Sequence, residues 1–180
     1  GGGGAVLRVP PPPPRGAVGP AAAVAGSVLP PLSCAAVVGV NSRGLVALAR
    51  QMSRARGAES CYIDYHPSFG AVPFGKVLCT SVNDAVLHGL PHDYRLRDSD
   101  LLSLDFAVSV DGWVCDSAVS VVVGTPRDED LELIDHAQDA LDAAIGVARA
   151  GNKVGYTPAA IGAAGRAQGP GRNAQLGRDR

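Results

Sequence analysis

Two aspartates eleven positions apart, Asp105 and Asp116, are the residues of this chain best suited to carry chemistry. They lie in the run 101–123, which reads as two β-strands joined by Asp111-Gly112. An Asp-Gly pair between β-rich runs is a strong hairpin signal, because both residues tolerate the positive φ of a type I′ turn. In that register the two aspartates are diagonal neighbours on one face of the sheet, roughly 7–8 Å apart at Cα.

Two carboxylates this close repel each other, so they need a cation, a shared proton or open water between them. The small residues Ala107 and Ala118 lie beside them in the same register and leave space for a ligand. One divalent metal ion, or a pair about 3.5–4 Å apart, fits this arrangement. The alternative is that both aspartates lie on a solvated sheet face and bind nothing, and the spacing alone favours neither.

Several regular elements must hold this hairpin in place. The first strand has a second, apolar face that predicts contact with a core: Leu102, Leu104, Phe106, Val108 and Val110. A helix is expected from about Val40 to Gly57, begun by Asn41 or Ser42 and carrying Leu45, Leu48, Ala49 and Met52 at helical spacing.

A second helix is expected after the hairpin. Thr125 suits the N-cap, Pro126 suits the first helical position, and Gly151 ends the segment. Its apolar residues recur at helical spacing and predict a buried stripe of Leu131, Ile134, Leu141, Ile145 and Ala148.

The chain of 180 residues suits one folded domain, which we place at residues 37–164. Residues 1–36 open with four glycines, continue with five prolines at positions 10–14, and are otherwise rich in Ala, Pro and Gly. That composition favours a disordered segment, which is a linker, a fusion artefact or a wrongly framed translation, with a proline-rich docking tail as the alternative. Residues 165–180 are rich in Gly and Arg and are expected to form a disordered or frame-disrupted tail.

Composition excludes several function classes. The net charge of −1 gives no basic footprint for nucleic acid, and no apolar run is long enough to span a bilayer, so neither partner is expected. The four cysteines lack the spacing of zinc ligands. They favour reduced thiols and a cytoplasmic location.

Three motifs together resemble the type I methionine aminopeptidases, in particular the actinobacterial ones. They are CTSVNDAVLHGLP (79–91), LRDSDLLSLDF (96–106) and DGWVCDSAVSVVVGTP (111–126). The resemblance covers roughly residues 40–161 and implies an α/β (α+β) pita-bread fold of two pseudo-symmetric halves, of which this chain matches the N-terminal half. It also implies the family's activity, removal of the N-terminal methionine from nascent polypeptides close to the ribosome.

The resemblance also implies roles for individual residues. Asp105 and Asp116 match the family's metal-binding aspartates, and the cofactors would be two divalent ions (Co, Mn, Fe or Zn). His88 matches the catalytic histidine that hydrogen-bonds the substrate. Three further residues match the methionine pocket: Tyr65, Phe74 and Cys79.

The chain also departs from the family pattern. The family's other metal ligands are one His and two Glu from the second half, and this sequence has no His or Glu after Gly151. Two aspartates alone make a weak metal site. We therefore expect little or no peptidase activity from the isolated chain. A non-catalytic pita-bread binding module and an inactive fragment remain as alternatives.

Overall fold

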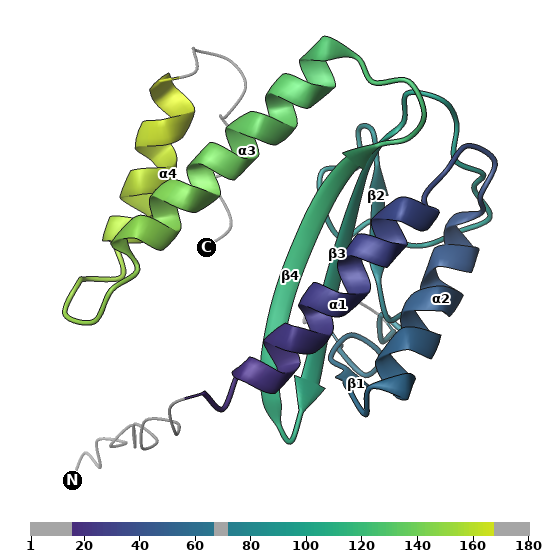
Figure 1. Ribbon diagram of the computed structural model, residues 1–180, viewed down its shortest axis with the longest axis horizontal. Helices are drawn as coiled ribbons and strands as arrows, with labels where there is room; N and C mark the ends of the chain where they lie inside the picture. Colours follow the sequence, from purple (N-terminus) through teal and green to yellow (C-terminus); the bar gives the residue numbers. More distant parts are fainter. Residues whose placement is uncertain (1–15, 67–71, 168–180) are drawn as a thin grey trace, which may run out of the picture.

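The computed structural model describes residues 16–66 and 72–167, which form a mixed α/β arrangement of helices around an antiparallel sheet (Figure 1). In chain order the elements are α1 (Gly19–Ala35), α2 (Ser42–Ala55), β1 (Glu59–Ser60), β2 (Cys79–Val82), β3 (Leu101–Val110), β4 (Trp113–Val122), α3 (Asp128–Val147) and α4 (Tyr156–Ala167).

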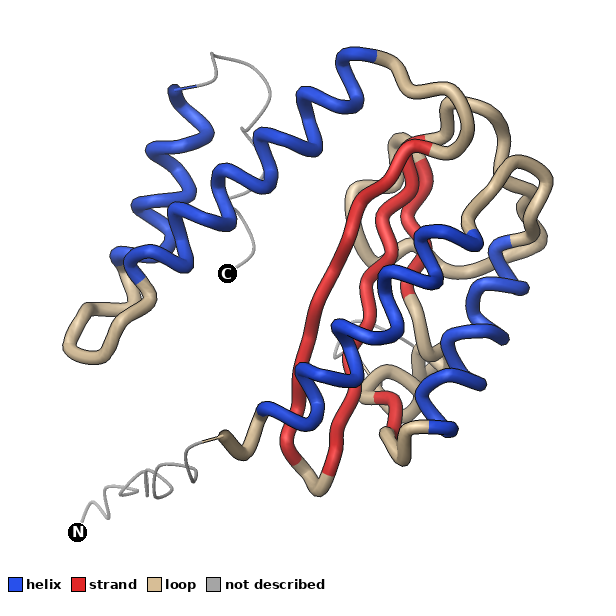
Figure 2. The backbone as a smooth tube through the Cα atoms, viewed as in Figure 1, coloured by secondary structure: helices blue, strands red, loops and turns tan. Residues whose placement is uncertain are grey.

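Strand β3 is the centre of the sheet. It pairs with β4 along one side, and with β1 and β2 along the other (Figure 2). The turn between β3 and β4 has φ of 51° at Asp111 and 80° at Gly112, both in the left-handed region that a type I′ turn requires. Val110 lies opposite Trp113, so the hairpin and its register, as predicted from the sequence, are confirmed.

One face of β3 forms the core. The alternating residues Leu102, Leu104, Phe106 and Val108 are all fully buried, which confirms the apolar face expected from the sequence. Helix α1 packs on β3 and β4, and α2 packs beside α1 and against β1. The two helices together with this face of the sheet therefore enclose one hydrophobic core.

Helix α1 corrects the expectation that residues 1–36 are disordered. Gly19–Ala35 is a helix whose residues Val28 and Leu32 are fully buried. Its buried residues recur every three or four positions, but the helix is apolar on nearly every side, so the sequence has no amphipathic pattern there that would indicate a helix. Pro20 lies in the first helical turn, where a missing N–H costs no hydrogen bond. Residues 1–15 lie outside the described residues.

Helix α2 matches its prediction. The Asn41 side chain accepts a hydrogen bond from the backbone N–H of Arg43 at 3.0 Å and so caps the helix. Leu45 and Ala49 are buried against the core. The opposite face of α2 is therefore turned away from the sheet.

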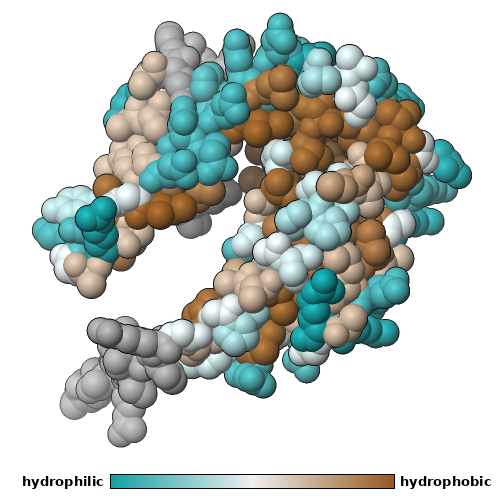
Figure 3. Space-filling model, in the orientation of Figure 1, coloured by the Kyte–Doolittle hydropathy of each residue, from teal (hydrophilic) through white to brown (hydrophobic). Residues whose placement is uncertain are grey.

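Helix α3 differs from its prediction in two ways. It begins at Asp128, with Arg127 as N-cap, because the backbone of Thr125 is engaged elsewhere. The expected buried stripe is wrong, since Leu131, Leu141 and Ile145 are 43%, 52% and 61% exposed. α3 packs mainly on α4, and Figure 3 shows a hollow between this helix pair and the body that holds the sheet. α4 continues to Ala167, which corrects the start of the expected tail, while residues 168–180 lie outside the described residues.

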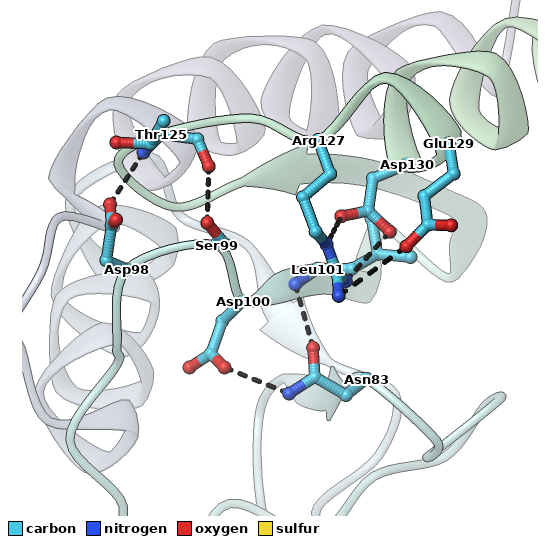
Figure 4. A network of polar contacts seen from close by, with 9 residues as sticks. All are labelled: Asn83, Asp98, Ser99, Asp100, Leu101, Thr125, Arg127, Glu129 and Asp130. Atoms are coloured by element: carbon cyan, nitrogen blue, oxygen red, sulfur yellow. Dashed lines mark hydrogen bonds and ion pairs between the residues drawn. The ribbon is translucent and has the colours of Figure 1, made fainter.

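A polar network fixes the start of β3 and the linker from β4 to α3 (Figure 4). Asp98 accepts a hydrogen bond from the backbone N–H of Thr125 at 2.6 Å, and the Ser99 hydroxyl donates to the Thr125 carbonyl at 2.7 Å. The buried carboxylate of Asp100 accepts from Asn83 at 2.9 Å. These bonds tie together the segments that lead into and out of the hairpin.

All four cysteines of the chain are free thiols. Among the described residues, no helix has both the length and the apolar character needed to cross a membrane.

Candidate metal centre

The β3–β4 hairpin places Asp105 and Asp116 on the face of the sheet opposite the core. Asp105 pairs across the strands with Ala118, and Asp116 pairs with Ala107, as expected from the turn. The Tyr62 hydroxyl lies within hydrogen-bond distance of both carboxylates, at 2.6 Å from Oδ1 of Asp105 and 3.2 Å from Oδ1 of Asp116. The two carboxylates therefore converge on one point in space.

Opposing effects act on the pKa of the Asp105 carboxylate. Burial raises the pKa of Asp105, the hydrogen bond from Tyr62 lowers it, the charge of Asp116 raises it, and His88 lowers it. The sum lies above the ordinary value for an aspartate. A half-buried carboxylate beside a second carboxylate is stabilised in its ionised form by a nearby cation, which is the condition that a metal site exploits.

Two thiols and a phenol surround the aspartates and stay protonated. Cys79, on β2, is buried directly opposite Asp105, and burial together with the charges of Asp105 and Asp116 raises the pKa of its thiol to about 12. Burial and the charge of Asp116 raise the pKa of Cys61. Burial and the hydrogen bond to Asp105 raise the pKa of Tyr62. None of the three is a nucleophile at neutral pH, because the reactive form of a thiol or phenol is the anion.

His88 lies in the loop that follows β2, with φ of 54°, and its side chain is exposed. The next residue holds this loop against the strand: Gly89 donates to the Ser81 hydroxyl at 3.0 Å, and its carbonyl accepts from the Thr80 N–H at 2.9 Å. A Cβ at position 89 would collide with the backbone of Thr80 and Ser81, so the close approach requires glycine. The charge of His88 lowers the pKa of Asp105, with a smaller effect than burial, Tyr62 or Asp116.

The expected methionine-pocket residues differ in how they relate to this site. Cys79 lies at the aspartates, and Phe74 makes an edge-on contact with Tyr62 at 5.9 Å between ring centroids. The Tyr65 side chain is 57% exposed, and its backbone binds the backbone of Tyr62 and Phe74. The structure therefore brings Cys79 to the centre, links Phe74 to it through Tyr62, and places Tyr65 further out.

Tyr62 is the residue of this site that the sequence reasoning missed. It lies three positions before Tyr65 in the same loop. Its place is set by β1, a strand of two residues, and by the bond from Cys61 N–H to the Ala107 carbonyl at 3.1 Å. A strand of two residues is too short to show alternating apolar and polar residues in the sequence. The only signal for Tyr62 was that it is an aromatic residue in a stretch rich in Cys, Tyr and His.

The donor set fits one side of a divalent metal centre. Carboxylate oxygens are hard ligands that suit divalent ions, and here two of them point toward one another beside small residues. Within residues 16–66 and 72–167, no group of three or more His, Cys, Asp or Glu side chains is placed to hold a metal ion. The described residues thus offer two candidate ligands, Asp105 and Asp116, which is fewer than a closed metal site requires.

The fold and the site together define a class of protein. The helix pair packed on an antiparallel sheet matches the pita-bread fold of solved methionine aminopeptidases and prolidases. The model of metallopeptidase family M24 matches residues 19–173, and the chain belongs to this family. The match begins at the first residue of α1, consistent with that helix being part of the domain.

Curated relatives of this chain are methionine aminopeptidases. The Aquifex aeolicus enzyme is 37% identical over 124 residues, which are 68% of this chain and 48% of that protein. Methionine aminopeptidase 1 of Mycobacterium tuberculosis is 32% identical over 139 residues, 77% of this chain and 50% of that protein. The chain therefore spans about half the length of the curated relatives it matches.

Solved structures agree with this assignment. Methionine aminopeptidase from Rickettsia prowazekii superposes with a TM-score of 0.77 at 27% identity, over 84% of this chain and 59% of that one. An X-Pro aminopeptidase from Thermotoga maritima shares the fold, with a TM-score of 0.69 at 18% identity, over 84% of this chain and 40% of that one.

Proposed function

We propose that this chain supplies the aspartate side of a metalloaminopeptidase centre that removes the N-terminal methionine of nascent polypeptides. Asp105 and Asp116 bind divalent metal ions, two of them in the complete centre, and polypeptide outside the described residues provides the remaining ligands. Membership of a metallopeptidase family and the methionine aminopeptidase relatives support the metal and the substrate class. The four free thiols agree with a reducing compartment such as the cytoplasm.

The convergence of Asp105 and Asp116 on one hydroxyl carries this proposal. The Tyr62 O–H lies 2.6 Å and 3.2 Å from oxygen atoms of the two carboxylates, so both carboxylates face the same small volume. A solvated sheet face without a ligand does not need two ionisable groups held together at the cost of mutual repulsion.

Each residue has a part in the proposed chemistry. Divalent metal ions supply Lewis-acid polarisation of a carbonyl and activation of water. Asp105 and Asp116 hold and orient the ions. His88 binds the substrate amide beside them from the exposed loop, and the loop bonds at Gly89 fix its position. Cys79 and Phe74 line the side of the site where the methionine side chain packs, and Tyr65 closes its rim.

The activity of an assembled enzyme tests this function. The chain is co-purified with a polypeptide carrying the family's remaining His and two Glu ligands, and release of methionine from a Met-Ala-Ser peptide is measured with added Mn(II) or Co(II). We expect release from the assembly and little or none from the chain alone. Asp116→Asn and His88→Ala should each lower kcat/KM by at least about 100-fold.

A matched variant controls for charge. Asp111 lies in the hairpin turn, and Asn also tolerates its φ of 51°, so Asp111→Asn removes one carboxylate from the same hairpin without disturbing the fold. It should retain full activity. Equal activity of Asp116→Asn and Asp111→Asn in the assembly would contradict the proposed role of Asp116, and an assembly that stays inactive with every metal would contradict the proposed reaction.

A further inference from the structure

A groove with a basic lining runs along the outer face of α2, away from the aspartates. Its volume is about 610 Å³, and it is bounded by α2 on one side and by the loops before and after β2 on the other. Four of its lining residues are cations: Arg43, Arg50 and Arg54 from α2, and Lys76 from the loop. The lining contains no Asp or Glu.

The arginines form a row because of their spacing. Positions 43, 50 and 54 are seven and four residues apart, which places them on one face of a helix. Helix α2 has no acidic residue to neutralise them. In the part of the chain that the structure describes, no ion pair involves any of these three arginines or Lys76. Four positive charges therefore share one groove without a counter-charge from the protein.

This groove is separate from the core and from the metal centre. The opposite face of α2 carries Leu45 and Ala49 into the core, so the arginine row is turned outward. None of Asp105, Asp116 and His88 lines the groove. The net charge of −1 led us to expect no nucleic-acid partner. A net charge is a sum over the whole chain, however, and does not reveal a local cluster of cations such as this one.

We propose that the α2 groove binds the phosphodiester backbone of a nucleic acid strand. Arg43 and Arg54 are eleven residues apart on a rigid helix, a distance of roughly 16 Å, so the arginine row is long enough to contact several successive phosphates of one strand. Arginine forks bind phosphate oxygens in a bidentate manner. The lining has no aromatic side chain on which a base stacks, so the contacts are with phosphates, which are the same for every base sequence.

A membrane surface and an acidic peptide are less well matched. A helix that binds lipid inserts large apolar side chains beside its cations, and no residue of α2 is among the exposed large hydrophobic residues. A peptide ligand would gain affinity from apolar anchors in a pocket, whereas the apolar groups in this lining are only Val46, Ala47 and Pro91.

Fluorescence anisotropy of the full 180-residue chain with labelled single-stranded RNA and DNA of one mixed sequence tests the proposal. We expect a Kd of about 10⁻⁴ to 10⁻⁶ M, weakening on the order of 50-fold between 50 and 200 mM salt for four phosphate contacts on a single strand. Binding of RNA, DNA or both supports the phosphodiester chemistry and identifies the source. If neither RNA nor DNA binds at 50 mM salt, the proposal is overturned.

Variants locate the binding. Arg43→Glu with Arg50→Glu should weaken binding by at least about tenfold, and Arg43→Gln with Arg50→Gln should weaken it less and flatten the salt dependence. The matched control is Arg149→Glu with Lys153→Glu, the same charge change on exposed residues between α3 and α4. An equal loss of affinity in the control and groove variants would overturn the proposed site. Displacement of the labelled strand by poly-glutamate at the same total charge as the RNA would also overturn it. Binding of Mn(II) by the groove variants should be unchanged, so this proposal and the proposed metal centre fail separately.

Discussion

The two helix pairs of this chain differ in what they cover. Helices α1 and α2 lie on the sheet, and their apolar residues Leu32 and Leu45 are almost fully buried. Helices α3 and α4 lie mainly on each other, and Leu141 and Ile145 of α3 are more than half exposed. Helices α2 and α3 both have apolar residues at helical spacing, so amphipathic periodicity shows which face of a helix is apolar without showing whether anything covers it.

The difference predicts unequal stability along the chain. The α1–α2 layer shares one core with the sheet, so it unfolds only with the whole domain. The α3–α4 pair has few buried residues, namely Asp130 and Ala144 in α3 and Gly165 in α4. We expect its amides to exchange with solvent through local opening, well before those of α1 and β3.

A matched pair of leucine substitutions gives the largest expected contrast. Leu32→Ala, in α1, removes a fully buried side chain and should lower the free energy of unfolding by about 2–5 kcal/mol. Leu141→Ala, in α3, changes a side chain that is 52% exposed and should cost less than about 1 kcal/mol. Guanidinium denaturation followed by circular dichroism measures both. Equal losses would show that α3 is as well packed in solution as α1.

Substitution of Asp100 tests the polar network at the start of β3. The Asp100 carboxylate is buried and accepts hydrogen bonds from the backbone N–H of Arg97 at 2.8 Å, from Asn83 at 2.9 Å and from the Tyr94 hydroxyl at 2.9 Å. Asp100→Ala leaves these donors unpaired and should cost about 1–3 kcal/mol of unfolding free energy. Asp84→Ala, on an exposed loop, should cost less than about 0.5 kcal/mol.

The same carboxylate predicts a pH dependence. Burial raises the pKa of Asp100, but its hydrogen bonds outweigh burial and lower the pKa below the ordinary value. Ionised Asp100 therefore stabilises the fold at any pH above its unfolded pKa of about 3.9, and this contribution is lost as pH falls through the lower folded pKa. The stability difference between wild type and Asp100→Asn should be constant above about pH 5 and shrink below about pH 4. A difference that grows on acidification would contradict the assignment.

Two glycine substitutions, one in the linker before α3 and one within α3, have smaller expected effects on stability. Gly124, in the linker between the regions, has φ of 71°, and a Cβ there would collide with the Asp98 carboxylate, so Gly124→Ala should cost about 1–2 kcal/mol. Gly146 lies inside α3 with open space around it, so Gly146→Ala should stabilise by about 0.5–1 kcal/mol. Thermal denaturation measures both shifts, and a stabilising Gly124→Ala would contradict the described linker.

The sequence predicted the hairpin and its aspartates because a two-residue turn fixes the register of both strands. It did not predict Tyr62 at the centre, because the strand that positions Tyr62 is only two residues long. Helix α1 was missed because it is apolar on nearly every side and rich in Ala, Pro and Gly, so its sequence has no amphipathic pattern. The exposure of α3 could not be predicted, since burial depends on tertiary contacts that periodicity does not report.

Calorimetric titration of Mn(II) into the purified chain tests the central claim most directly, which is that Asp105 and Asp116 bind metal together. We expect weak binding by the wild type and by Asp111→Asn, and none by Asp105→Asn or Asp116→Asn, because two carboxylates hold the ion only jointly. Wild-type affinity in Asp116→Asn would contradict the claim, as would the absence of any binding by the wild type at millimolar Mn(II).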